Sequence, residues 1–389
     1  MEHASILLIM GPVNHIQSTR YVPGCDQLPE SSHNHHRTIR SSPSMHTSLD
    51  SRAQLILSQY APFDDGFEDF RHLPAGMFNE NASFVARGQK YVLKKLPGGR
   101  SRERHLYALH WQNHLAREGF PCPTFLPNRD GDLITAREGQ FWTVQTWAHG
   151  GPLDLSILEG PQAREIMLEV GTTLGRLHRL SREASQSGAV PPAERSCRIT
   201  LSEMIDGCRS ALKRLYISRW WRPSRVTLLR WKPFKSPVEK EILTMLATVR
   251  SAFAELDGWD PASVEEQSRP IPCHGDINWE NFLFQENRLT AVLDFDNALE
   301  MPVEYEVAAA AAIVCRRDDP MRRWFLEGYA QEADWSVSEE DMRLLMLLKC
   351  CKSLLFQIET ALGDGTKDER GAREWRLYLA EKVRFYSVG

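Results

Sequence analysis

The stretch from Ile271 to Asn297 constrains the fold of this chain more than any other. Two short apolar runs, 282–284 and 289–293, flank a polar turn at 285–288, a pattern that predicts a β-hairpin. A hairpin brings its two outer ends together. Polar side chains stand at both of these ends: His274, Asp276 and Asn281 before the first run, and Asp294 and Asp296 after the second.

These residue types at this spacing suit phosphoryl transfer from a nucleotide. The carboxylate of Asp276 would accept the proton of the attacking hydroxyl. Asn281 and Asp294 would lie close enough to share one metal ion, and they offer the oxygen ligands that Mg²⁺ prefers. Asp296 ranks below Asp294 as a ligand. The alternative is a surface hairpin with solvated acids, which the order of three separate elements disfavours.

His274-Gly275-Asp276, Asn281 and Asp294-Phe295-Asp296 follow the order of the protein kinase motifs. They resemble the aminoglycoside phosphotransferase and choline kinase-like family, whose signature is His-Gly-Asp, four residues, Asn, then a strand ending in Asp-Phe-Asp. The resemblance implies an α+β, two-lobed protein kinase-like fold. It also implies that ATP and Mg²⁺ bind between the lobes and that the acceptor is a small-molecule hydroxyl.

The segment from Phe67 to Leu96 reads as short strands joined by a glycine turn. The resemblance places Gly76 and Asn81 in a loop that covers the nucleotide phosphates, and it places Lys94 in contact with them. Strand alternation would turn Lys95 to the opposite face, into solvent. By itself the segment is equally compatible with a plain β-hairpin.

A helix is predicted over 101–119, with a stop at Gly119. In the family this helix carries a glutamate that pairs with the strand lysine, and Glu103 is the candidate here, with the pairing left open. The resemblance also implies that backbone groups from Gln145 to Trp147 bind adenine. An edge strand with packed aromatics is the alternative. Residues 150–152, Gly-Gly-Pro, are expected to form a flexible connection after the last strand of the small lobe.

Apolar residues at helical spacing predict a core helix over 165–180, in which Gly175 would permit close packing and His178 would be structural. Glu306 is expected to complement a helix dipole. Further helices are expected near 307–315, 321–331, 338–361 and 368–385. The predicted organisation is a disordered tail over 1–50, a nucleotide-binding lobe over 51–148 and a catalytic and substrate-binding lobe over 149–389.

The overall composition is that of an ordinary globular protein and excludes few classes of function. A net charge of −4 and the absence of a long apolar run give no indication of nucleic acid or of a membrane span. The eight cysteines form no Cys-x-x-Cys pair, which favours reduced thiols and a cytoplasmic location.

One stretch is strongly basic, although the chain as a whole has a small net negative charge. Nine basic residues and no acidic one lie between Asp206 and Glu239, interleaved with Trp220, Trp221 and Trp231. The stretch could bind an anionic ligand, nucleic acid or a membrane surface, or it could be a solvated helix face with its tryptophans packed inward. If it faced the acceptor site, it would repel a polycationic substrate.

The favoured function is therefore an ATP-dependent small-molecule kinase. Its rival is a non-catalytic, nucleotide-binding member of the same fold that acts as a binding or scaffold protein. The sequence leaves the acceptor open among an amino alcohol, an antibiotic, homoserine and a sugar. Glu359 and Asp364 lie where family members place acids that contact the substrate.

Overall fold

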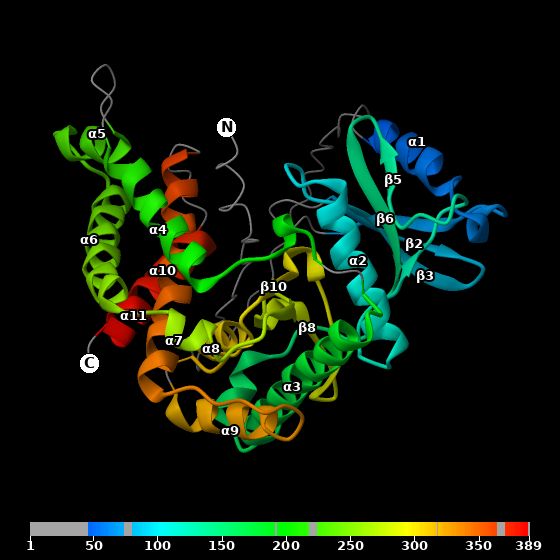
Figure 1. Ribbon diagram of the computed structural model, residues 1–389. Helices are drawn as coiled ribbons and strands as arrows, with labels where there is room; N and C mark the ends of the chain where they lie inside the picture. The colour runs from blue at the N-terminus through cyan, green and yellow to red at the C-terminus, as the bar shows by residue number, and fades with distance from the viewer. Residues whose placement is uncertain are drawn as a thin grey trace, which may run out of the picture.

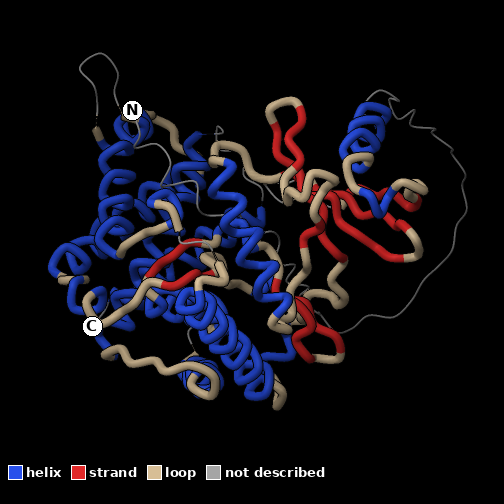
Figure 2. The backbone as a smooth tube through the Cα atoms, turned by 45° about the vertical axis from the view of Figure 1, so that its right-hand side comes forward, coloured by secondary structure: helices blue, strands red, loops and turns tan. Residues whose placement is uncertain are grey.

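The computed structural model describes residues 46–73, 80–190, 193–217, 224–316, 318–363 and 370–387. Gly76, Asp364 and most of the N-terminal tail lie outside these ranges. A β-sheet region and a larger helical region stand side by side (Figure 1). The strands of the sheet gather on one side of the molecule and most of the helices on the other (Figure 2). The predicted α+β architecture, with a strand-rich and a helix-rich region, is thus confirmed.

The sheet has antiparallel strands in the order β1-β2-β3-β6-β4, with β5 paired to β6. Their bounds are β1 Glu68–His72, β2 Asn81–Ala86, β3 Gln89–Lys95, β4 Phe125–Leu126, β5 Thr135–Arg137 and β6 Gln140–Thr146. Arg87 and Gly88 join β2 to β3, and both have positive φ, of 49° and 73°. Two consecutive turn residues with positive φ give a two-residue hairpin turn whose twist matches that of the flanking strands.

Helices cover both faces of this sheet. Helix α1 (His46–Leu57) and the short turn η2 (Ala61–Phe63) contribute to one apolar cluster, which includes Trp142 of β6. Helix α2 (Arg102–Arg117) contributes to a second cluster, against which Phe141 packs. Because consecutive residues of a strand point to opposite faces, Phe141 and Trp142 mark the two sides of the sheet.

The remaining helices build the second region. Their bounds are η3 Leu155–Glu159, α3 Ala163–Ser187, η4 Arg195–Cys197, α4 Leu201–Tyr216, α5 Arg225–Trp231, α6 Pro237–Gly258, α7 Ala262–Glu265, α8 Val303–Val314, α9 Asp319–Tyr329, α10 Glu339–Gly363 and α11 Arg370–Ser387. No helix within the described ranges is long and apolar enough to cross a membrane. The seven described cysteines are free thiols.

Glycines bring helices α3 and α9 into close contact. A Cβ on Gly171 would lie 2.0 Å from the carbonyl oxygen of Phe325, and one on Gly328 would lie 2.1 Å from that of Leu168. A Cβ on Gly175 would approach Tyr329 O to 2.6 Å. The expectation that Gly175 permits close helix packing is confirmed, and Gly171 and Gly328 contribute in the same way.

The predicted hairpin forms within the helical region as β8 (Phe282–Gln285) and β9 (Arg288–Val292). Its turn residues Glu286 and Asn287 have φ of 50° and 64°, the conformation favoured in two-residue hairpin turns. Two shorter segments, η5 (Trp279–Asn281) and η6 (Phe295–Asn297), adjoin its outer ends. Strands β7 (Ile271–Cys273) and β10 (Leu299–Met301) pair antiparallel beside them.

The exit from the sheet is anchored rather than flexible. Gly151 N donates to Phe284 O at 2.9 Å, and Phe284 N donates to Gly151 O at 2.8 Å. The hydroxyl of Thr290 donates to His149 O at 2.7 Å. A Cβ on Gly150, whose φ is 123°, would lie 2.4 Å from Thr290 Oγ1. These contacts fix the linker to the hairpin.

Three of the seven basic residues that the structure describes in the basic stretch are paired with acids. Arg209 pairs with Asp206 and Asp257, Arg214 with Glu359, and Lys232 with Glu239. Trp231 is 72% exposed, so it does not pack inward as the solvated-face interpretation expected. Trp220 and Trp221 lie outside the described residues.

Candidate active site

The loop between β7 and η5 is shaped by Gly275 and His274. Gly275 has φ +80°, and a Cβ there would lie 2.4 Å from Asn297 O, so only glycine fits. The buried ring of His274 accepts a hydrogen bond from Asp276 N at Nδ1 (3.2 Å) and donates from Nε2 to Leu293 O (2.8 Å). His274 therefore connects the two outer ends of the hairpin, as its place in the sequence suggested.

Asp276 occupies the tip of this loop. Burial raises the pKa of its carboxyl group above the ordinary value, and Lys349 and His274 offset part of that rise. The negative charge of Asp294 raises it further. A carboxylate whose proton affinity is increased in this way is better suited to accept a proton than a solvated aspartate.

Asn281 is held with its side chain in a defined orientation. Its Nδ2 donates to Asp276 O at 2.8 Å, which leaves Oδ1 as the atom that could bind a cation. Across the ends of the hairpin, Leu293 N donates to Asn281 O at 2.8 Å. The structure thus brings the metal-ligand candidates Asn281 and Asp294 to the same end of the hairpin.

Lys94 of the sheet reaches the acids of the helical region. Its Nζ donates to Asp294 Oδ1 at 3.0 Å and to Asp296 Oδ1 at 2.7 Å. Burial alone would lower the pKa of Lys94, but the two carboxylates outweigh it and raise that pKa. Arg100 also donates to Asp296 O and, at 2.8 Å, to Asn297 Oδ1. We call Lys94, Asp294, Asp296 and Arg100 the interlobe cluster.

Asp294 is the most accessible acid of this cluster. Its backbone is left-handed, with φ 62° and ψ 61°, and its side chain is 38% exposed, against 8% for Asp296. Although burial alone would raise the pKa of Asp294, Lys94 keeps it below the ordinary value. The pKa of Asp296 is raised by burial and by Asp294. Asp294 is therefore an ionised oxygen donor that a ligand can reach.

The sequence interpretation missed the role of two arginines near helix α2. Arg104 is buried, and its Nη2 lies 3.4 Å from Asn297 O. Glu103, the candidate partner of Lys94, is fully exposed instead, and hydrogen bonds in its own first turn, from its backbone and from Ser101, lower its pKa. Lys94 thus pairs with the acids after β9, and Glu103 serves the helix N-terminus.

The predicted nucleotide residues lie along the sheet and its exit. Asn81 pairs with Lys94 across β2 and β3, and its Oδ1 is buried with no partner among the described residues. Gln145 is within β6, while Trp147 N donates to Lys90 O at 3.1 Å and its ring lies under Lys90 Nζ. The backbone N–H of Trp147 is therefore already used within the sheet.

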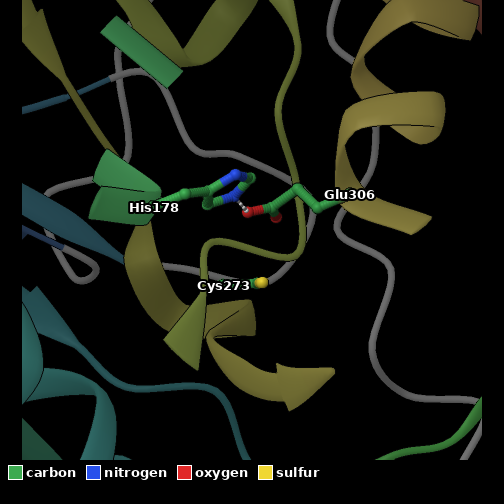
Figure 3. A group of neighbouring side chains, drawn as sticks. All are labelled: His178, Cys273 and Glu306. Carbon is green, nitrogen blue, oxygen red and sulfur yellow. Dashed lines mark hydrogen bonds and ion pairs between the residues drawn. The ribbon is translucent and has the colours of Figure 1, made fainter. Parts of the chain in front are cut away.

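A second buried group of side chains supports the loop from behind. His178 of α3 donates from Nε2 to Glu306 Oε2 at 2.8 Å (Figure 3). Its Nδ1 lies 2.9 Å from the hydroxyl of Tyr329. Glu306 also accepts hydrogen bonds from His274 N, at 2.9 Å, and from Gly275 N. Despite its burial, these donors keep the pKa of Glu306 low. We call His178, Glu306 and Tyr329 the supporting network.

His178, Glu306 and Cys273 also lie close enough together to ligate a metal ion (Figure 3). Both carboxylate oxygens and both ring nitrogens already have hydrogen-bond partners, and burial raises the pKa of the Cys273 thiol well above its ordinary value. A thiolate ligand is therefore disfavoured. The structural role expected for His178 agrees with this geometry, whereas Glu306 binds the loop backbone in addition to starting a helix.

Three comparisons with known proteins fit this arrangement. The homoserine kinase of Rhizobium meliloti (strain 1021) is 25% identical over 317 residues, which cover 79% of this chain and 84% of that protein. A spectinomycin phosphotransferase bound to ADP and spectinomycin superposes with a TM-score of 0.58 at 11% identity, covering 87% of this chain and 98% of that one. An amicoumacin kinase bound to AMP-PNP, Ca²⁺ and its antibiotic superposes with a TM-score of 0.55 at 14% identity, covering 88% of this chain and 96% of that one.

The family assignment rests on a longer match. A model of the phosphotransferase enzyme family matches residues 69–340, which begin in β1 and end in α10 and so include the sheet, the hairpin and both buried clusters. The loop of Asp276, the hairpin ends at Asn281 and Asp294, and the lysine that reaches them from the sheet all lie inside that match. This chain belongs to the phosphotransferase enzyme family.

Proposed function

We propose that this protein is an ATP-dependent kinase that transfers the γ-phosphoryl group to a hydroxyl of a small molecule. One observation carries the proposal: Lys94 of the sheet bonds to Asp294, beside the loop that presents Asp276. A cation suited to donor phosphates, an oxygen ligand suited to a metal ion and a carboxylate suited to act as a general base then lie near one another, which supports phosphoryl transfer.

The donor set fits a magnesium ion. Asn281 Oδ1 and the half-exposed carboxylate of Asp294 are hard oxygen ligands, and Mg²⁺ typically takes one or two protein carboxylates together with substrate phosphates. When bound, the ion would neutralise charge on the transferring phosphoryl group. Asn281 and Asp294 would hold it, and Lys94 would steady the donor phosphates.

Asp276 would then orient the acceptor hydroxyl and take its proton. The hydroxyl oxygen forms a bond to the γ-phosphorus while the bond from that phosphorus to the bridging oxygen of ADP breaks. ADP leaves with the electron pair, and Asp276 passes the proton to water. Nucleotide contacts by Gly76, Asn81, Gln145 and Trp147, and the division into lobes at 51–148 and 149–389, are further parts of this proposal.

The test is acceptor-stimulated turnover of ATP with Mg²⁺, in wild type, Asp276→Ala and Glu286→Gln. Glu286 lies in the exposed turn of the same hairpin, so it controls for loss of an acid. The first acceptors to test are homoserine, spectinomycin and amicoumacin, which the names of the relatives suggest, followed by pooled amino alcohols and sugars. Stimulation that Asp276→Ala abolishes and Glu286→Gln keeps is the expected result.

The rival function is a binding or scaffold protein that holds a nucleotide without transferring phosphate. It predicts ATP binding by calorimetry with no acceptor-stimulated turnover in any pool. The intact set of Asp276, Asn281 and Asp294 favours the kinase. If ATP does not bind at all, both functions are excluded.

A further inference from the structure

A small pocket lies directly behind the loop that presents Asp276. Gly275 and Ile277, the two neighbours of Asp276, form part of its wall, and Tyr305 of α8 forms another part. Two lysines of α10, Lys349 and Lys352, complete it. The other lining residues are mostly apolar: Ile199, Met204, Leu299, Met301, Ala309 and Ala310, with the carboxylate of Glu306 at one side.

The two lysines point the same way because they are three residues apart on one helix. Lys349 is only 6% exposed, and Lys352 Nζ lies 5.7 Å from the ring centre of Tyr305. Burial lowers the pKa of Lys352 to about 8, and the nearby charge of Lys349 contributes to that shift. Among the described residues, neither ammonium has a hydrogen-bonded or ion-paired partner.

Buried cations in proteins are normally paired, because removing a charge from water is costly. Two anionic groups affect Lys349 here, Asp276 and Glu306, and both raise its pKa, although burial lowers it more. Glu306 is already engaged by His178 and by the backbone of His274 and Gly275. Asp276 is the proposed base. Within the described residues the pocket therefore presents two lysines that form no direct ion pair, although Asp276 and Glu306 act on Lys349 at longer range.

We propose that Lys349 and Lys352 bind a carboxylate of the acceptor and so place its hydroxyl beside Asp276. The pocket holds about 20 Å³ of free space, little more than one water molecule occupies, so it fits a small planar group rather than a sugar ring or a phosphate. The inference rests on the proposed function and narrows the acceptor to a hydroxy acid.

The same geometry disfavours polycationic antibiotics as acceptors. An ammonium group of such a ligand next to Lys349 and Lys352 would meet two like charges in a site of low polarity. This repulsion arises within the pocket itself. It does not depend on the basic stretch between Asp206 and Glu239, in which Arg209, Arg214 and Lys232 are paired with acids.

The test compares matched pairs of probes that differ only in the carboxylate. Homoserine, 4-hydroxybutanoate and glycerate are paired with homoserinol, 1,4-butanediol and glycerol. Equilibrium binding is measured by calorimetry with wild type, Lys352→Met, Lys349→Met and the control Lys213→Met. Lys213 is exposed on α4 and outside the pocket. Melting temperatures establish that each variant is folded.

We expect at least one acid to bind about 10- to 100-fold more tightly than its alcohol, the range of a charge-assisted hydrogen bond. Lys352→Met should remove this preference and Lys213→Met should keep it. Lys349→Met should remove it too, and it provides the test if Lys352→Met does not fold. Equal binding of each acid and its alcohol, binding of neither, or a preference that survives both pocket variants overturns the inference.

Turnover with ATP separates this result from the proposed function. A protein that phosphorylates an alcohol as well as its acid is a kinase without the carboxylate site. A protein that binds the acid through Lys349 and Lys352 but never turns over ATP has the site without the kinase activity.

Discussion

The interlobe cluster and the supporting network are both buried groups of charges beside the same loop, yet they differ in how completely they are satisfied. In the supporting network, His178 is 0% exposed and Glu306 2%, and every nitrogen and oxygen has a protein partner. In the interlobe cluster, Asp294 remains 38% exposed beside an almost buried lysine. The interlobe cluster is therefore open to a ligand, whereas the supporting network fixes the loop.

The largest expected effect removes the base between the two clusters. Asp276→Asn should lower kcat by roughly 10³-fold, within the range for loss of a general base, because the amide cannot take a proton. Its melting temperature should stay close to that of wild type, since the amide preserves the shape. Glu286→Gln is the control. Retention of more than a tenth of the activity by Asp276→Asn would contradict the assignment of the base.

The next prediction compares Lys94, which belongs to the interlobe cluster, with its neighbour Lys95, which does not. Lys94→Met leaves Asp294 and Asp296 without their shared cation, and breaking a buried pair costs about 3–5 kcal/mol of folding free energy. We expect this loss in urea unfolding, together with a large rise in the KM for ATP. Lys95→Met removes only the pair with Glu80 on the other face of β3, worth about 0–1 kcal/mol. Similar effects of the two variants would show that Lys94 has no special role.

A smaller effect is expected in the closed network. Glu306→Gln replaces an anionic acceptor of three hydrogen bonds by an amide, and the poorer bonds should cost about 1–3 kcal/mol of stability. Activity should fall less than in Asp276→Asn, because Glu306 acts on the loop only through its backbone. If Glu306→Gln is as stable as wild type and yet inactive, Glu306 belongs to the chemistry and the contrast between the clusters fails.

The smallest expected effect is a difference between the pH at which activity declines and the pH at which the melting temperature declines. Burial raises the pKa of Asp276, and the base must be ionised, so activity should fall as the pH drops through that raised value. The pKa of Glu306 is lowered on folding, so its stabilising contribution is present above the ordinary value of 4.5 and is lost only as the pH drops through the lower, folded value. The rate profile should therefore decline at a higher pH than the melting temperature. Coincident declines would mean that both report unfolding.

The sequence predicted the elements that depend on local pattern. Apolar runs around a polar turn located β8 and β9, and helical periodicity located α2, α3 and the later helices. Spacing alone brought Asn281 and Asp294 to one end of the hairpin. The place of Lys94 was predicted from the family resemblance, and alternation along β3 predicted that Lys95 lies on the opposite face.

Contacts between distant segments could not be predicted in the same way. Arg100 and Arg104 reach residues after β9, and Glu306 binds Gly275, 31 residues earlier in the chain. No local sequence pattern indicates either contact. Lys349 lies in the middle of a long apolar helix pattern, where nothing marks a residue that faces Asp276. The partners of Lys94 were also missed, since the expected acid, Glu103, points to solvent.

The anchored linker has a mechanical consequence. Trp147 N is bonded to the sheet through Lys90 O, whereas His149 O and both backbone groups of Gly151 are bonded to the hairpin. Only Ala148 lies between the last attachment on one side and the first on the other. Along the linker, the change from attachment to the sheet to attachment to the hairpin therefore takes place within the few backbone torsions around Ala148.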